Sequence, residues 1–161
     1  MKKILLIVLI IPALITGCSK KEMGCTPIAP ALEETKIMAY AAANGITLAK
    51  HSRGIYYNIV DSGSGMRPTA SSRVYVTYIG KLLDGRTFEE STSTVDLLLT
   101  DVIEGWQIGI PLIKKGGKIR LIIPSSYGYG CIDKTDPNNG NKVVIPGNSV
   151  LYYDVSLVDV K

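Results

Sequence analysis

The clearest periodic pattern lies in residues 73–80, where Val74, Val76 and Tyr78 alternate with the residues between them. A period of two predicts a half-buried β-strand. Asp84-Gly85 follows and is a strong hairpin signal. Further strands are predicted from composition at four segments, which are residues 54–60, 95–99, 117–124 and 149–160.

Two segments are predicted to be helical. In residues 31–46, Leu32, Ile37, Met38 and Ala41 form an apolar stripe, and Asn44-Gly45 provides a C-terminal stop. A short helix is predicted at residues 101–113, and a long loop is predicted at residues 125–148. This order of elements favours an α+β fold, in which a curved antiparallel sheet wraps around one short helix and an extra N-terminal helix docks beside it.

The first 17 residues have the pattern of a signal peptide. Lys2 and Lys3 precede an apolar run, residues 4–15, that is too short to span a bilayer. The run ends in "LITGC", which resembles the lipobox of bacterial lipoproteins. That resemblance implies cleavage before Cys18 and lipidation of Cys18, and hence a lipid-anchored protein of the bacterial cell envelope, on its periplasmic or surface face. A simple secretion signal that is cut elsewhere is the alternative.

The remaining chain divides into three parts. Residues 18–30 are expected to form a tether, residues 31–53 a helical extension and residues 54–161 one domain. Without residues 1–17, 16 basic and 14 acidic side chains remain and are scattered, which argues against a nucleic-acid partner. Apart from Cys18, the cysteines are Cys25 and Cys131. An oxidising compartment would permit them to pair, but no sequence feature brings them together, so separate thiols are expected.

Reactive side chains are scarce. His51 is the single histidine and lies in a polar turn, so a nucleophilic triad would depend on it alone. Neither a cysteine–histidine cluster with metal-ligand spacing nor a phosphate-binding loop is present. The sequence therefore predicts no metal and no cofactor. An enzyme with this sequence would act through the environment of its pocket rather than through a reactive group.

Four segments, taken in order, carry a more specific signal. They are "VTYIGKLLDGRTFEES", "VIEGWQIGI", "KKGGKIRLIIPSSYGYG" and "VIPGNSVLYYDVSLVDV". Their order and most of their spacings resemble the FKBP-type peptidyl-prolyl cis–trans isomerases, over about residues 74–160. The family fold implied by this resemblance is a curved antiparallel sheet around a short helix, with a proline-binding pocket between them.

The resemblance also implies roles for individual residues. Trp106 is expected to form the pocket floor, Tyr78 and Phe88 its walls, and the Tyr129 hydroxyl a donor to a substrate carbonyl. Glu89 stands where the family usually has aspartate, which leaves open whether its longer side chain keeps the usual contact. The expected substrate-binding positions are Val102 and Ile103 at the mouth, Ile145 and Tyr153 in the lining, and Val95 in place of a second aromatic wall.

The activity implied by this resemblance is cis–trans isomerisation of X–Pro bonds during the folding of exported proteins. A membrane-tethered peptide-binding or chaperone module with weak isomerase activity is the second interpretation, and a purely structural envelope lipoprotein is the third. The expected partners are proline-containing polypeptides and, through Cys18, a membrane. Macrolide inhibitors and a second copy of the chain, bound through the N-terminal helix, are further candidates.

Overall fold

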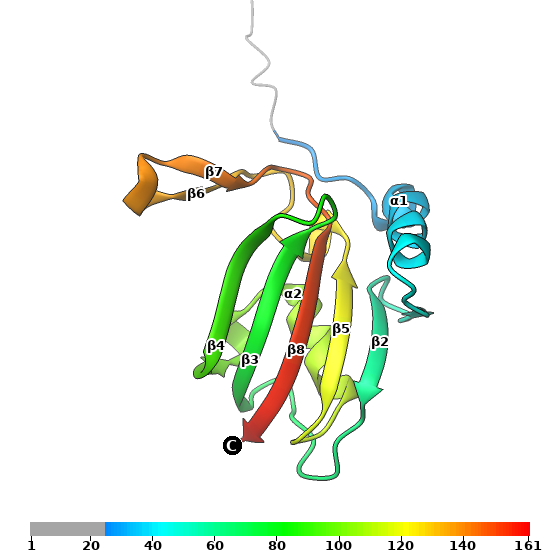
Figure 1. Cartoon of the computed structure of the whole chain (residues 1–161), viewed down its shortest axis with the longest axis vertical. Coiled ribbons are helices and arrows are strands. Elements are labelled where there is room, and N and C mark those ends of the chain that lie inside the picture. The colour runs from blue at the N-terminus through cyan, green and yellow to red at the C-terminus, as the bar shows by residue number, and fades with distance from the viewer. Residues whose placement is uncertain (1–24) are drawn as a thin grey trace, which may run out of the picture.

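The computed structural model describes residues 25–161. The predicted signal peptide, Cys18 and the tether as far as residue 24 lie outside the described residues. Six antiparallel strands form one sheet in the order β1-β2-β5-β8-β3-β4 (Figure 1). Their bounds are β1 Ala49–Lys50, β2 Tyr56–Asp61, β3 Arg73–Leu82, β4 Thr87–Leu98, β5 Lys118–Ile123 and β8 Leu151–Val160. The predicted α+β fold is confirmed.

The short helix α2 (Glu104–Gly109) packs against one face of the sheet and covers the main core. Alternate residues of β8 point toward it and are buried, as the period of two requires. Two glycines allow the close approach: a Cβ on Gly105 would lie 2.4 Å from a side-chain carbon of Ile123, and one on Gly109 would lie 2.5 Å from Leu121. The space between α2 and the sheet is therefore set by these two positions.

The N-terminal helix α1 (Pro30–Ala43) packs on a second, smaller apolar cluster. Its members lie on α1, on strands β2 and β5, and before β8; they are Ile37, Tyr56, Ile122 and Val150. The C-terminal half of β5 is therefore buried on both faces, which explains its continuous apolar run at residues 121–123. The predicted apolar stripe of this helix was wrong in part. Leu32 and Met38 are exposed, whereas Glu33 is buried together with Ile37 and Ala41.

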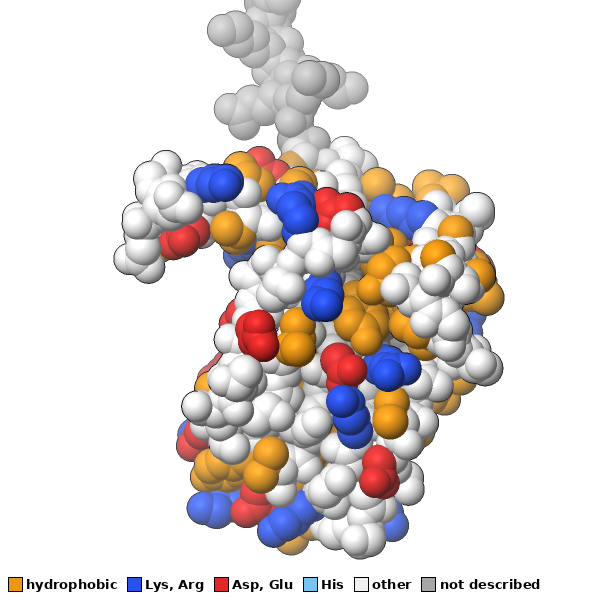
Figure 2. All heavy atoms as spheres, viewed as in Figure 1, with side chains coloured by type: hydrophobic (Ala, Val, Ile, Leu, Met, Phe, Trp, Pro, Cys, Tyr) orange, Lys and Arg blue, Asp and Glu red, His pale blue; other side chains and the backbone are white. Residues whose placement is uncertain are grey.

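The segment predicted as a long loop contains ordered elements. A one-turn 3-10 helix, η3 (Ser125–Tyr127), is followed by a hairpin of β6 (Lys134–Asp136) and β7 (Lys142–Ile145), with η4 (Pro137–Asn139) at its tip. The hairpin projects from the body and carries basic and acidic side chains (Figure 2). The predicted strand at residues 95–99 is mostly the end of the longer β4, which runs to Leu98. Next to α2 lie the 3-10 turns η1 (Leu99–Asp101) and η2 (Ile110–Leu112).

Cys25 and Cys131 form a disulfide with a Cα–Cα distance of 5.4 Å. The expectation of two separate thiols was wrong, because the fold brings together residues that are 106 positions apart in the sequence. The expected tether is therefore covalently attached, at Cys25, to the segment after η3. Across residues 25–161, no helix is long and apolar enough to cross a membrane.

Candidate functional site

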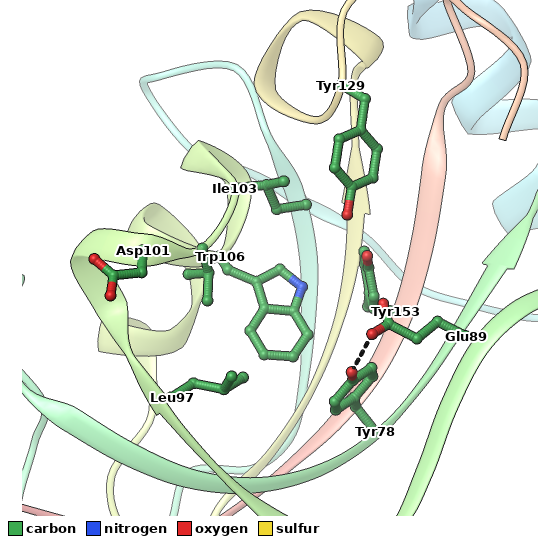
Figure 3. Close-up of a pocket in the computed structure, with 9 residues that line it drawn as sticks. Tyr78, Glu89, Leu97, Asp101, Ile103, Trp106, Tyr129 and Tyr153 are labelled. Atoms are coloured by element: carbon green, nitrogen blue, oxygen red, sulfur yellow. Dashed lines mark hydrogen bonds between the residues drawn. The ribbon is translucent and has the colours of Figure 1, made fainter. Parts of the chain in front are cut away.

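A pocket of about 220 Å³ opens between α2 and the sheet (Figure 3). It draws side chains from β3, β4, β8, the segment before α2 and the loop after η3. Most of its lining is apolar or aromatic, and its acidic members are two carboxylates. The lining residues are Tyr78, Glu89, Leu97, Asp101, Val102, Ile103, Trp106, Tyr129 and Tyr153.

Trp106 lies at the centre of an aromatic cluster. The rings of Tyr78 and Tyr153 each lie 5.1 Å from it, at interplanar angles of 90° and 83°. Edge-to-face contacts of this kind fix ring orientation, and they add to the free energy gained by burial. The indole is almost fully buried, and among the described residues its Nε1 has no hydrogen-bond partner. The pocket floor is thus a fixed apolar plane with one unused N–H donor.

Tyr78 is held by Glu89. The Tyr78 hydroxyl donates a 2.5 Å hydrogen bond to Oε1 of Glu89 (Figure 3). β3 and β4 pair antiparallel, with Gly80 opposite Glu89, so the longer glutamate side chain reaches back to the tyrosine two residues before that glycine. Burial, together with this hydrogen bond, raises the pKa of Tyr78. Its hydroxyl therefore remains protonated and fixed at the pocket wall.

Tyr129 reaches the pocket from the loop after η3, and its hydroxyl points inward (Figure 3). Burial raises the pKa of Tyr129, so the hydroxyl keeps its proton and can donate. Lys134 Nζ lies 4.8 Å from the centre of the Tyr129 ring and links it to the hairpin. The pocket therefore contains a protonated hydroxyl donor that enters from the loop after η3.

The mouth of the pocket is formed by the residues that lead into α2. Val102 and Ile103 are half-buried and pack against the main core. Gln107 Nε2 donates a 2.8 Å hydrogen bond to the Val102 carbonyl, which fixes the backbone just before the helix. The two aliphatic side chains at the mouth therefore project from a backbone that is fixed by a hydrogen bond from α2.

Sequence comparison assigns the fold and this pocket to a family. Residues 65–158 match the sequence model of the family described as FKBP-type peptidyl-prolyl cis-trans isomerase. The chain belongs to the FKBP-type peptidyl-prolyl cis-trans isomerase family. The matched residues include every lining residue of the pocket.

Named relatives and solved structures of FKBP-type isomerases are similar over a large part of this chain. The FKBP-type peptidyl-prolyl cis-trans isomerase FkpA of Buchnera aphidicola is 42% identical over 118 residues, which is 71% of this chain and 44% of FkpA. The crystal structure of FkpA from Escherichia coli superposes with a TM-score of 0.67 at 36% identity, covering 82% of this chain and 61% of that one. A peptidyl-prolyl cis-trans isomerase structure from Pseudomonas syringae gives 0.65 at 27% identity, with 84% and 98% coverage. The chain spans less than half the length of the curated relative.

Three residues expected from the FKBP-type resemblance do not line the pocket. Phe88 packs edge-on against Tyr153 at 5.5 Å and closes against Gly80, so it supports the lining from behind. Val95 pairs with Val76 on β3 and packs against the main core. Ile145 is buried at the end of β7. These three side chains therefore lie beside the lining rather than in it, and their contact with a substrate stays a prediction.

Two lining residues, Leu97 and Asp101, were missed. Leu97 lies two residues after Val95, so the alternation of a strand places both on one face, but alternation alone does not show which of the two reaches the pocket. Asp101 immediately precedes Val102 and lies at the rim, with its carboxylate pointing away from the indole (Figure 3). No sequence pattern distinguishes it from the other exposed acids. Among residues 25–161, no group of His, Cys, Asp or Glu could hold a metal ion.

Proposed function

We propose that this chain catalyses the cis–trans isomerisation of X–Pro bonds in exported polypeptides, using the pocket around Trp106. Family membership supports this proposal, and one observation carries it: a buried indole with two edge-on tyrosines forms a fixed apolar floor beside the hydroxyl of Tyr129. The pocket offers a surface for a proline ring and a donor for a flanking carbonyl.

The chemistry of X–Pro rotation suits such a pocket. Rotation about an amide bond has a barrier of roughly 20 kcal/mol because resonance is lost in the twisted state. The planar amide is more dipolar than the twisted one, so an apolar environment disfavours the ground state relative to the transition state. A hydroxyl such as that of Tyr129 holds the peptide while the bond turns. This route requires neither a covalent intermediate nor a cofactor.

A protease-coupled assay with Ala-Leu-Pro-Phe-type peptides tests the activity. The parental chain should accelerate isomerisation above the uncatalysed rate, and Trp106→Leu should lower kcat/KM by about tenfold or more, which corresponds to at least about 1.4 kcal/mol. Tyr152→Phe is the matched control, because Tyr152 packs on the opposite face of the sheet against Tyr40. A parental chain without acceleration that still prevents aggregation of a client would favour the chaperone interpretation instead. A Trp106→Leu variant that bound a macrolide inhibitor as tightly as the parent would contradict the pocket assignment.

We also propose that Cys18 is lipidated and anchors the protein in the bacterial envelope. The support is the lipobox-like "LITGC" and the Cys25–Cys131 disulfide, a bond that persists in oxidising compartments. Incorporation of a labelled fatty acid into the parental chain but not into Cys18→Ala is the expected result. Labelling of both, or of neither, would contradict lipidation at this cysteine.

Dimerisation through the N-terminal helix would have to use the part of α1 that is not already packed. Ile37 and Ala41 are buried against the chain's own sheet, whereas Leu32 and Met38 are exposed. If the chain dimerises in this way, Leu32→Asp with Met38→Asp should shift the sedimenting species to a monomer. A monomeric parental chain would exclude this partner.

A further inference from the structure

Glu33 is a buried carboxylate on a helix that lies outside the residues matched by the family model. Its side chain is 1% exposed. One oxygen, Oε2, accepts a 2.7 Å hydrogen bond from the backbone N–H of Ser125, and Oε1 lies 2.9 Å from Nζ of Lys36. A buried carboxylate is costly unless it is hydrogen-bonded and paired, and the first turn of a helix favours a negative charge. Glu33 satisfies these conditions at a contact between α1 and the loop that carries Tyr129.

Ser125 connects that contact to Tyr129. It is fully buried and begins η3. Its carbonyl accepts hydrogen bonds from Gly128 N at 3.0 Å and Gly130 N at 2.8 Å. These two glycines flank Tyr129 in the sequence. Ser125 is therefore held by Glu33 through its N–H and in turn holds the backbone on both sides of Tyr129 through its carbonyl.

A second attachment lies at the other end of the same loop. The disulfide joins Cys25 to Cys131, two residues after Tyr129. The segment before α1 runs across the end of the sheet from the base of the hairpin to the helix (Figure 1). Residues 25–33 thus hold the loop 125–131 at its first and last residues, by a hydrogen bond at Ser125 and a covalent bond at Cys131.

We propose that the N-terminal segment, residues 25–43, is a brace for the pocket, and that Glu33 is a positioning residue that sets the place of the Tyr129 hydroxyl through Ser125. This inference rests on the proposed function in assigning Tyr129 to substrate contact. An N-terminal segment that served only to cover apolar surface would need neither a buried carboxylate nor a covalent bond to this particular loop.

Steady-state kinetics of the full chain in detergent test the proposal. Glu33→Ala is expected to raise KM for the proline peptide about fivefold with kcat within about twofold, because a contact made equally in ground and transition states is weakened. Glu33→Gln keeps an oxygen that accepts from Ser125 N and should remain within about twofold of the parent. The matched control is Glu34→Ala, which removes the neighbouring exposed carboxylate and its 2.8 Å pair with Lys50 but no contact to the loop.

Coupling to Tyr129 distinguishes positioning from a general loss of stability. In a Tyr129→Phe background, Glu33→Ala should have less than about a twofold further effect, since the hydroxyl that it positions is gone. Equal losses in both backgrounds, or the same loss in Glu34→Ala, would overturn the proposal. If Glu33→Ala does not fold, the Cys25→Ser, Cys131→Ser double variant replaces it, with a rise in KM of about threefold expected only when Tyr129 is present.

A binding measurement separates this proposal from the proposed function. Trp106 is the single tryptophan of the chain, so its fluorescence reports peptide binding in the pocket without turnover. A parental chain that binds the peptide but does not isomerise it would overturn the proposed function alone. A Glu33→Ala chain that is folded and binds the peptide as tightly as the parent would overturn the proposal that residues 25–43 brace the pocket.

Discussion

The hydroxyl of Tyr78 donates a 2.5 Å hydrogen bond to the carboxylate of Glu89, and both residues line the pocket. The FKBP-type pattern usually has the shorter aspartate at this position, but here the extra methylene does not prevent a carboxylate contact. The bond ties β4 to β3 where the aromatic cluster begins. The wall of the pocket is therefore fixed by a polar contact at its edge and by ring packing at its centre.

Removing the Glu89 carboxylate should loosen this wall. We expect Glu89→Ala to lower kcat/KM by roughly three- to tenfold, about 1 kcal/mol, because Tyr78 loses the acceptor for its hydroxyl. Glu89→Gln retains an acceptor oxygen and should stay within about twofold. Glu90→Ala, the exposed neighbour, is the control. If Glu89→Ala has the same kcat/KM as the parent in the isomerase assay, the hydrogen bond from Tyr78 to Glu89 is not required for activity.

The close approach of α2 to the sheet should depend on Gly105. Gly105→Ala places a methyl group 2.4 Å from Ile123, so the helix that carries Trp106 must shift. Overpacking of this kind costs about 1–3 kcal/mol of unfolding free energy, and the displaced indole should also reduce kcat/KM. Glu104→Ala, on the exposed side of the same helix, removes an ion pair with Arg53 and should cost less than about 1 kcal/mol. Denaturant unfolding of both variants measures the difference, and equal values would contradict this account of the glycine.

The alternation of β3 and the Asp84-Gly85 turn could be predicted from the sequence because a period of two and a glycine-containing turn are local properties. The same holds for the position of Trp106, since the surrounding motif specifies a known arrangement. Which residues of β4 face the pocket could not be predicted. The pairing shifts between Val76–Val95 and Tyr78–Ser91, so three residues of β4 lie opposite one of β3. That irregularity depends on cross-strand packing, and it decides whether Leu97 or a neighbour reaches the pocket.

The contacts of residues 25–43 with the rest of the domain could not be predicted either, for a different reason. The buried positions of α1 are Glu33, Ile37 and Ala41, which are spaced by four. A carboxylate at one of these positions is expected to face solvent unless a buried partner for it is known. The partner is a backbone N–H 92 residues away. The disulfide likewise joins residues 106 positions apart. A single sequence contains no local signal for either contact.

The pocket tyrosines should make the fold sensitive to alkali. Burial raises the pKa values of Tyr78, Tyr129 and Tyr153. In the unfolded chain these hydroxyls ionise near pH 10, whereas in the fold they stay protonated. The unfolded state therefore binds fewer protons above about pH 10, so the contribution of these three tyrosines to the unfolding free energy should be constant up to that pH and fall beyond it.

Tyr153→Phe tests whether the unfolding free energy falls at alkaline pH because these hydroxyls ionise in the unfolded chain. It removes one of these three pocket hydroxyls, so the loss of unfolding free energy between about pH 10 and pH 11 should be smaller than in the parent. Denaturant unfolding at a series of pH values provides the measurement. An identical alkaline decrease in both proteins would show that Tyr153 does not contribute to it.

The two lining carboxylates, Glu89 and Asp101, should bias the choice of substrate. Neither Lys nor Arg is among the lining residues, and Lys134 stands behind the Tyr129 ring rather than in the pocket. A peptide with lysine before proline should therefore have a kcat/KM about two- to fivefold higher than one with glutamate there, since exposed charges a few ångströms apart are worth up to about 1 kcal/mol.

Asp101→Asn should reduce this ratio of kcat/KM values, and 0.5 M salt should reduce it in the parent because exposed charges are screened. The isomerase assay with the two peptides measures the ratio, and Asp96→Asn, on β4 and paired with Arg73 outside the pocket, is the control. A ratio that is insensitive to both Asp101→Asn and salt would show that the rim charge does not select substrates.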